Sequence, residues 1–125
     1  MAKRILVVDD EPALTRMIKL GLEQTGRFEV RTENQGMAAL PAVRDFKPDL
    51  VVLDVMMPDM PGDEVAAELR EDPALAGTPV IFLTAIVTRE ETDAGGTEIG
   101  GNLFLAKPVQ ATELVAAIDS VLGVD

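Results

Sequence analysis

Cysteine and histidine are both absent from this chain of 125 residues. Their absence excludes disulfide bonds, catalysis by a thiolate or an imidazole, and zinc sites of the Cys/His type. Any chemistry must therefore come from carboxylates, hydroxyls, lysine or the backbone. Trp and Tyr are also absent and aromatic residues make up only 3% of the chain, so we expect a core of aliphatic side chains.

Basic residues are scarce, because 11 Lys and Arg stand against 22 Asp and Glu and give a formal net charge of -11. A surface with this charge repels phosphate backbones and anionic lipid headgroups, so we expect no direct binding to nucleic acid or to a membrane. Hydrophobic runs are too short for a membrane span, and the four apolar residues after Arg4 are too few for the core of a signal peptide. We expect a soluble, cytoplasmic protein.

Apolar residues make up 47% of the chain, which suits one compact domain over residues 1–125. Runs typical of strands alternate with segments that have the apolar period of helices. The predicted strands are 4–8, 28–32, 49–55, 79–84 and 102–106, and the predicted helices are 12–24, 35–46, 63–71, 89–101 and 111–122. Several strands are apolar on both faces, which favours a doubly wound α/β fold with a five-stranded parallel sheet and five flanking helices.

Two of the predicted helices contain residues that disfavour a helix. Pro41 lies inside 35–46, so this helix is either kinked or shorter than its pattern. The segment 89–101 contains four glycines and is the weakest element. Two hypotheses fit this segment: a helix of low local stability that orders on activation or binding, or a shortened helix with a glycine loop.

Candidate site residues stand where the strands end: Asp9 and Asp10 after the first, Asp54 at the third, Thr84 with the backbone of Ala85 at the fourth, and Lys107 after the fifth. In open parallel sheets, ligands bind outside the carboxyl ends of the strands. Clustered carboxylates repel one another unless they take up protons or hold a cation, and oxygen ligands with remaining water favour Mg²⁺. An aspartate can also act as a nucleophile toward phosphorus, with a metal and a lysine offsetting charge on the transferred group.

The motifs "VVDDE", "LDVMMPDMPG", "LTA" and "KP" occur in this order at the ends of the first, third, fourth and fifth predicted strands. With these motifs the chain resembles, over essentially its whole length, the receiver domain of two-component response regulators, of the chemotaxis-regulator type. The resemblance implies a flavodoxin-like sheet with strand order 2-1-3-4-5. It also implies a cis peptide bond between Lys107 and Pro108.

The resemblance implies a metal site and a phosphoacceptor. Asp54 would accept a phosphoryl group from a histidine kinase or a histidine phosphotransfer protein. Mg²⁺ would be bound by Asp10 directly, by Asp9 through water, by Asp54, and by the backbone carbonyl of Met56. Glu11 stays outside this site and is interpreted as an acid in the first turn of the first helix, where the helix dipole favours it.

The resemblance also implies groups that respond to the phosphoryl group. Lys107 would pair with it, the Thr84 hydroxyl would donate a hydrogen bond to it, and the Ala85 N–H would complete the cradle. Phe104 matches the aromatic switch position, and its ring would move inward as Thr84 moves. Met56 and Ile86 are apolar at positions that influence hydrolysis in the family, so we hypothesise slow self-dephosphorylation.

The predicted function is a phosphorylation-dependent signalling switch that acts through an unknown downstream protein or output domain. At most it catalyses its own phosphorylation and dephosphorylation, and it is not a metabolic enzyme. One alternative is a pseudo-receiver that only binds partners, against which the complete set of site residues argues. Another is a metal-dependent phosphatase with an aspartate nucleophile, which needs a second acid where Met56 stands.

Overall fold

The computed structural model describes residues 2–85, 97–99 and 102–123. Six strands form one sheet in the order β2-β1-β3-β4-β6-β5. The strands are β1 (Lys3–Val8), β2 (Phe28–Glu33), β3 (Leu50–Asp54), β4 (Val80–Thr84), β5 (Thr97–Ile99) and β6 (Asn102–Ala106). The helices are α1 (Pro12–Glu23), the 3₁₀ helix η1 (Gly36–Ala38), α2 (Ala39–Phe46), α3 (Gly62–Glu71) and α4 (Ala111–Leu122).

The sheet contains the predicted five parallel strands. The parallel pairs β2–β1, β1–β3, β3–β4 and β4–β6 give the predicted order 2-1-3-4-5 when β6 is counted as the fifth parallel strand. The sixth strand, β5, pairs antiparallel with β6 at the edge of the sheet. The flavodoxin-like fold class is therefore confirmed, with one additional edge strand.

The prediction of a helix over 89–101 is wrong at Thr97–Ile99, which is strand β5. Thr and Ile are β-branched and favour strands, and the glycines of this segment oppose a helix. Residues 86–96 and 100–101, which include all four glycines and the rest of the predicted helix, lie outside the described residues. The described part of the chain therefore has four α-helices where five were predicted.

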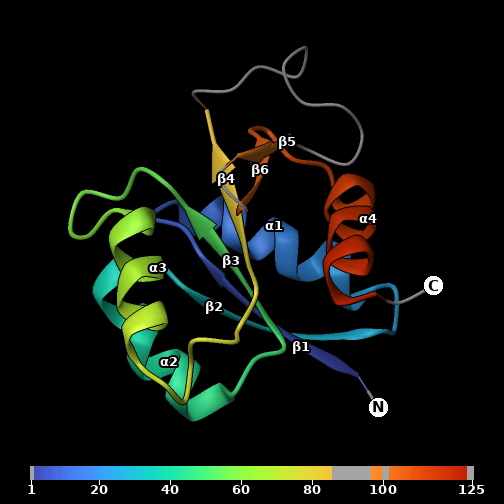
Figure 1. Cartoon of the computed structure of the whole chain (residues 1–125). Helices are drawn as coiled ribbons and strands as arrows, with labels where there is room; N and C mark the ends of the chain where they lie inside the picture. Colours follow the sequence, from blue (N-terminus) through green and yellow to red (C-terminus); the bar gives the residue numbers. More distant parts are fainter. Residues whose placement is uncertain (1, 86–96, 100–101, 124–125) are drawn as a thin grey trace.

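Helices cover both faces of the sheet. In β1, Ile5 and Val7 pack in a cluster with apolar side chains of α1 and α4, whereas Leu6 and Val8 pack with those of α2 and α3. Figure 1 shows α2 and α3 on one side of the sheet and α1 and α4 on the other. This alternation explains why the central strands are apolar on both faces and why β3 and β4 are buried throughout.

Proline positions set the starts of two helices. Pro12 is the first residue of α1, as predicted. Pro41 is the third residue of α2. The N–H groups of the first helical turn have no partner within the helix, so the missing N–H of Pro41 costs no intrahelical hydrogen bond. The shorter version of the predicted 35–46 helix is therefore confirmed, and the 3₁₀ helix η1 fills the preceding residues.

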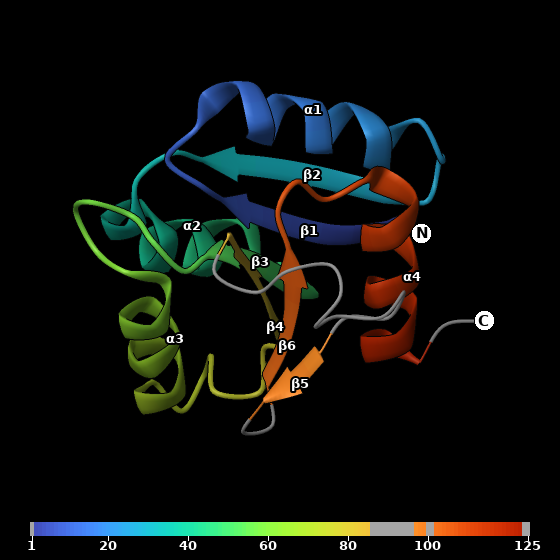
Figure 2. The same ribbon diagram turned by 90° about the horizontal axis from the view of Figure 1, so that it is seen from above.

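The strand order places a switch point between β1 and β3. The chain runs from β1 to the outer strand β2 and then crosses to β3 on the other side of β1. Figure 2, which looks at the molecule from above, shows β1 and β2 beneath α1 and the remaining strands leading away from them. Ligand sites of such sheets lie at the carboxyl ends next to this switch point, and the acidic residues follow the strands there.

Candidate functional site

Three carboxylates meet at the carboxyl ends of β1 and β3. These strands are neighbours with Val8 beside Leu53, so Asp9 and Asp54 lie next to each other. Both are buried, with exposed fractions of 0% and 3%, whereas Asp10 is exposed. One carboxylate oxygen from each of the three lies within 4.8 Å of the others. The predicted acidic cluster is therefore present and can hold a metal ion.

Lys107 reaches this cluster from the end of β6. Its Nζ atom lies 2.8 Å from Oδ2 of Asp9 and 3.2 Å from Oδ2 of Asp54. Its backbone N–H donates a hydrogen bond of 2.9 Å to the Thr84 carbonyl, which ties the end of β6 to the end of β4. The peptide bond between Lys107 and Pro108 is cis, as predicted. Asp9, Asp10, Asp54 and Lys107 thus form one pocket.

The electrostatics of the pocket favour a bound cation. Burial raises the pKa of Asp54, and the charge of Asp9 raises it further, against the opposing effect of Lys107. Burial also raises the pKa of Asp9, although its contacts with Lys107 and the Glu11 N–H lower it. Burial lowers the pKa of Lys107, but the two carboxylates outweigh this effect and raise it. One ammonium therefore does not fully compensate the buried carboxylates.

The buried carboxylate of Asp9 is also suited to be a metal ligand. Its Oδ2 atom is fully buried and faces the Lys107 ammonium at 2.8 Å, so this oxygen already lies beside a positive charge. Its Oδ1 atom accepts a hydrogen bond of 3.0 Å from the Glu11 N–H, which fixes the orientation of the carboxylate. The donor set consists of oxygens, as a hard divalent cation such as Mg²⁺ requires.

The loop between β3 and α3 packs closely on the end of β3. The Met56 N–H donates to Oδ1 of Asp54 over 3.3 Å, and the Met56 side chain is 65% exposed. A Cβ atom on Gly62 would lie 2.2 Å from the Asp54 carbonyl oxygen. Glycine is therefore required at the end of the "LDVMMPDMPG" motif, because any side chain would push the end of β3 and the start of α3 apart.

The remaining predicted site residues lie on β4 and β6. Thr84 is buried at the end of β4 and pairs with Ala106, the residue before Lys107, while Ala85 is exposed. Phe104 is half-buried and stacks on Phe82, with ring centroids 4.9 Å apart and an angle of 18° between the rings. Ile86 lies outside the described residues.

Glu11 is closer to the pocket than predicted. It is the N-cap residue of α1 and lies outside the first turn, so its interpretation as a first-turn acid is wrong. Its side chain makes no capping hydrogen bond, and Oε1 instead lies 3.4 Å from Nζ of Lys107. The two residues are 96 positions apart, and no local pattern indicates such a contact.

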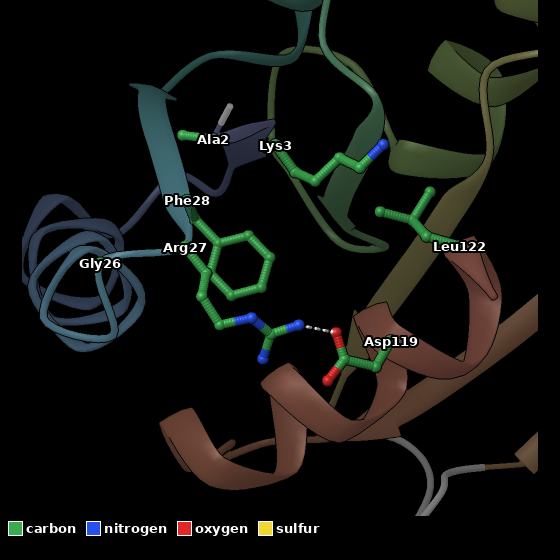
Figure 3. A pocket seen from close by; sticks show the side chains of 7 residues that line it. All are labelled: Ala2, Lys3, Gly26, Arg27, Phe28, Asp119 and Leu122. Atoms are coloured by element: carbon green, nitrogen blue, oxygen red, sulfur yellow. Dashed lines mark hydrogen bonds and ion pairs between the residues drawn. The ribbon is translucent and has the colours of Figure 1, made fainter. Parts of the chain in front are cut away.

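A second concave site lies at the opposite ends of β1 and β2. This cavity of about 440 Å³ has Lys3, Arg27 and Asp119 of α4 among its lining residues. Figure 3 shows the Arg27 side chain pairing with Asp119. The Arg27 guanidinium also lies over the Phe28 ring, 5.0 Å from its centroid. None of the residues that line this cavity belongs to the acidic pocket. The predicted metal and phosphoryl site is therefore at the opposite, carboxyl ends of the strands.

Comparison with known proteins gives consistent matches. A family model, the response regulator receiver domain, matches residues 5–119. The DNA-binding response regulator MtrA of Mycolicibacterium smegmatis is 41% identical over 118 residues, which cover 94% of this chain and 50% of that protein. The alkaline phosphatase synthesis transcriptional regulatory protein PhoP of Bacillus subtilis is 38% identical over 123 residues, with 98% and 49% covered. The structure of the chemotaxis protein CheY4 of Vibrio cholerae superposes with a TM-score of 0.81 at 27% identity, with 97% of this chain and 99% of that chain covered.

Fold and pocket together define a flavodoxin-like domain with an acidic site at its switch point. The chain belongs to the response regulator receiver domain family. It spans about half the length of the curated relatives it matches. Within the described residues, no helix has the length and apolar character needed to cross a membrane.

Proposed function

We propose that this receiver domain is a phosphorylation-operated switch in which Asp54 accepts a phosphoryl group from a histidine kinase or a histidine phosphotransfer protein. The observation that carries the proposal is the Asp54 carboxylate, buried beside Asp9 and 3.2 Å from the Lys107 ammonium. A carboxylate in this position is oriented for attack on phosphorus, and a cation next to it offsets the charge of the transferred group.

In the proposed reaction, an oxygen of Asp54 forms a bond to phosphorus as the bond between phosphorus and the donor histidine nitrogen breaks. Asp9, Asp10 and Asp54, with the Met56 carbonyl, would hold Mg²⁺, which supplies positive charge next to the phosphoryl oxygens. Lys107 keeps its ammonium at the Asp54 oxygen and then pairs with the phosphoryl group. Its raised pKa keeps it protonated for this role.

The response to phosphorylation involves the ends of β4 and β6. The Thr84 hydroxyl and the Ala85 N–H would donate hydrogen bonds to phosphoryl oxygens. Movement of Thr84 would let the Phe104 ring leave its stack on Phe82 and turn inward. Phosphorylation then shifts an equilibrium between two arrangements, and the size of the shift equals the extra free energy by which the phosphoryl group stabilises one arrangement over the other.

The donor protein must place its histidine over Asp54, so it covers the surface around the pocket. Met17 and Leu20 on α1 are 60% and 58% exposed. A groove lined by Met17, Pro108 and Val109 joins α1 to the segment after Lys107. We assign this apolar surface to the donor, because contacts with its aliphatic side chains would fix the donor histidine in line with Asp54.

The output passes through another protein or domain. Relatives such as MtrA are named DNA-binding response regulators. The net charge of -11 opposes contact between this chain and DNA, so any such output of the whole protein would reside outside the receiver fold.

Phosphorylation is tested by intact-protein mass spectrometry after incubation with acetyl phosphate, with and without Mg²⁺. We expect a mass increase of one phosphoryl group on the native chain, dependent on Mg²⁺ and absent from Asp54→Asn. The apolar Met56 side chain cannot orient water, so the phosphorylated form should persist well beyond seconds after the donor is removed.

Two outcomes would contradict the proposal. If neither acetyl phosphate nor a panel of phosphorylated histidine kinases labels the native chain, the pseudo-receiver explains the fold better. Rapid turnover of diverse phosphomonoesters would identify a phosphatase, for which Met56 lacks the acidic proton donor.

A further inference from the structure

The short turn after β2 contacts both loops that carry the metal-site residues. This bridging turn, residues 34–37, carries no carboxylate and is not among the predicted site residues. It lies between the β1–α1 loop, which contains Asp9 and Asp10, and the β3–α3 loop, which contains Met56. Figure 2 shows the ends of β1 and β2 and the β3–α3 loop on the same side of the molecule.

On one side, Asn34 holds the β1–α1 loop. Its Nδ2 atom donates hydrogen bonds to the Asp9 carbonyl over 2.8 Å and to Oγ1 of Thr15 over 3.1 Å. The Asp9 carbonyl belongs to the peptide group that joins Asp9 to Asp10, so this bond orients the backbone of both acids. Thr15 is buried and donates in turn to the Pro12 carbonyl over 3.1 Å, which anchors Asn34 to the first turn of α1.

On the other side, the bridging turn holds the β3–α3 loop. The N–H groups of Gly36 and Met37 donate to the two carboxylate oxygens of Asp59, each over 3.0 Å. These bonds hold the pKa of Asp59 below its usual range. A Cβ atom on Gly36 would lie 2.4 Å from the Met60 carbonyl oxygen, so the bridging turn and the β3–α3 loop approach as closely as their backbones allow.

From these contacts we infer that the bridging turn sets the spacing between the two loops, with Asn34 and Asp59 as positioning residues for the divalent cation. The inference rests on the proposed function, since it concerns the same metal site. Mg²⁺ requires near-ideal octahedral geometry, so its affinity depends on where the two loops place their oxygens. Residues that orient metal ligands from behind typically change metal affinity by 10-fold or more when they are lost.

The test is a Mg²⁺ titration of the full chain, followed by backbone amide NMR shifts because the chain has no Trp or Tyr to report by fluorescence. Asn34→Ala and Asp59→Ala should each weaken Mg²⁺ binding by about 10-fold. The Mg²⁺ affinity of the double variant should be little lower than that of either single variant, because the loss of one contact already lets the distance between the two loops vary. Asp59→Asn keeps one acceptor oxygen and should fall between Asp59→Ala and the native chain.

Two controls separate positioning from general effects. Gln35 lies in the same turn, and its exposed side-chain amide makes no hydrogen bond to either loop among the described residues. Gln35→Ala should therefore leave Mg²⁺ binding unchanged. Asp63→Asn removes an exposed negative charge near the β3–α3 loop, and it measures how much Mg²⁺ affinity is lost when only a charge is removed. Thermal unfolding without metal shows that each variant is folded, and Asp59→Asn replaces Asp59→Ala if the latter is not.

Mg²⁺ affinities of Asn34→Ala and Asp59→Ala that match their controls would overturn the inference. So would a double variant whose loss equals the product of the single losses, because the two residues would then act independently. If the native chain itself binds no Mg²⁺, the proposed metal-dependent function is overturned and the inference with it. Native binding with unaffected variants overturns the inference alone.

Discussion

At the scale of single residues, the pocket concentrates negative charge that the fold does not fully neutralise. Burial and the adjacent Asp9 charge raise the pKa of Asp54 from 3.8. A carboxyl whose pKa is raised by folding binds its proton more tightly in the folded state. It therefore contributes stability at pH values below its unfolded pKa, and this contribution is lost as pH rises through the folded pKa. At neutral pH, the ionised pocket without metal destabilises the fold.

Replacing the Asp54 charge should therefore stabilise the metal-free protein. We expect Asp54→Asn to raise the unfolding midpoint at pH 7 with a chelator present, and a gain of ~1 kcal/mol corresponds to roughly 3–6 °C at this chain length. The gain should shrink as pH falls toward the ordinary range of aspartate, where the native Asp54 is protonated too. Thermal unfolding of both proteins at a series of pH values from about 8 down to about 4.5 measures how this gain changes as Asp54 becomes protonated.

Glu68→Gln is a matched control for this prediction, since Glu68 is exposed on α3 and loses its charge in the same way. The difference in unfolding midpoint between Glu68→Gln and the native chain should not show the pH dependence that we expect for Asp54→Asn. Equal midpoints for the native chain and Asp54→Asn at all pH values would contradict the assignment of unfavourable charge to the pocket.

At the scale of elements, the pocket depends on close approaches between loops and strand ends. Gly62 begins α3 against the Asp54 carbonyl, and its N–H donates to the Val55 carbonyl over 3.0 Å. Gly36 lets the segment after β2 reach the β3–α3 loop in a similar way. Helices α1 and α4 approach one another through Gly21, whose added Cβ would lie 2.7 Å from that of Ala111.

We expect Gly62→Ala to disturb the fold and the pocket together. The new methyl group would overlap the Asp54 carbonyl oxygen, so α3 or the end of β3 must move, at a cost of about 1–3 kcal/mol. The same shift should lower the rate of phosphorylation by acetyl phosphate. Urea unfolding and intact-protein mass spectrometry measure the two effects.

Gly77→Ala is the control, because a Cβ at Gly77 would meet nothing within 4 Å and its φ angle is not in the left-handed region. It should change the free energy of unfolding by less than ~0.5 kcal/mol. A Gly62→Ala variant as stable as Gly77→Ala would contradict the predicted overlap.

At the scale of the whole molecule, metal binding at the acidic pocket would be linked to folding. The carboxylates come from two strands held between two apolar clusters, one with α1 and α4 and the other with α2 and α3. An unfolded chain does not assemble this pocket, so a cation that binds the folded state stabilises it by mass action. A bound cation would also relieve the repulsion between Asp9 and Asp54.

Mg²⁺ should therefore raise the unfolding midpoint of the native chain in a concentration-dependent way. At a free concentration 100 times the Kd, the gain is about 2.7 kcal/mol. Asp54→Asn should show a smaller gain, and Ca²⁺ compared with Mg²⁺ reports the preference of the site. A native midpoint that does not respond to Mg²⁺ at millimolar concentration would contradict the metal site.

Most of the fold and part of the pocket were predictable from the sequence for local reasons. Apolar runs such as 50–53 and 80–83 indicate strands buried on both faces, and such strands form a parallel sheet whose ends meet. The polar residues at those ends could therefore be placed together before their distances were known. The helix predicted over 89–101 failed at Thr97–Ile99, because helical periodicity there competed with β-branched residues next to glycines.

The sequence by itself determined the class of the fold and which acids follow its central strands, since both depend on patterns within short segments. Only the tertiary structure decided which groups support those acids. Glu11 meets Lys107 across 96 positions, Asn34 meets Asp9 across 25, and Gly36 meets Asp59 across 23. These contacts depend on the paths of loops around the sheet, and hydrophobic periodicity carries no information about a loop's path.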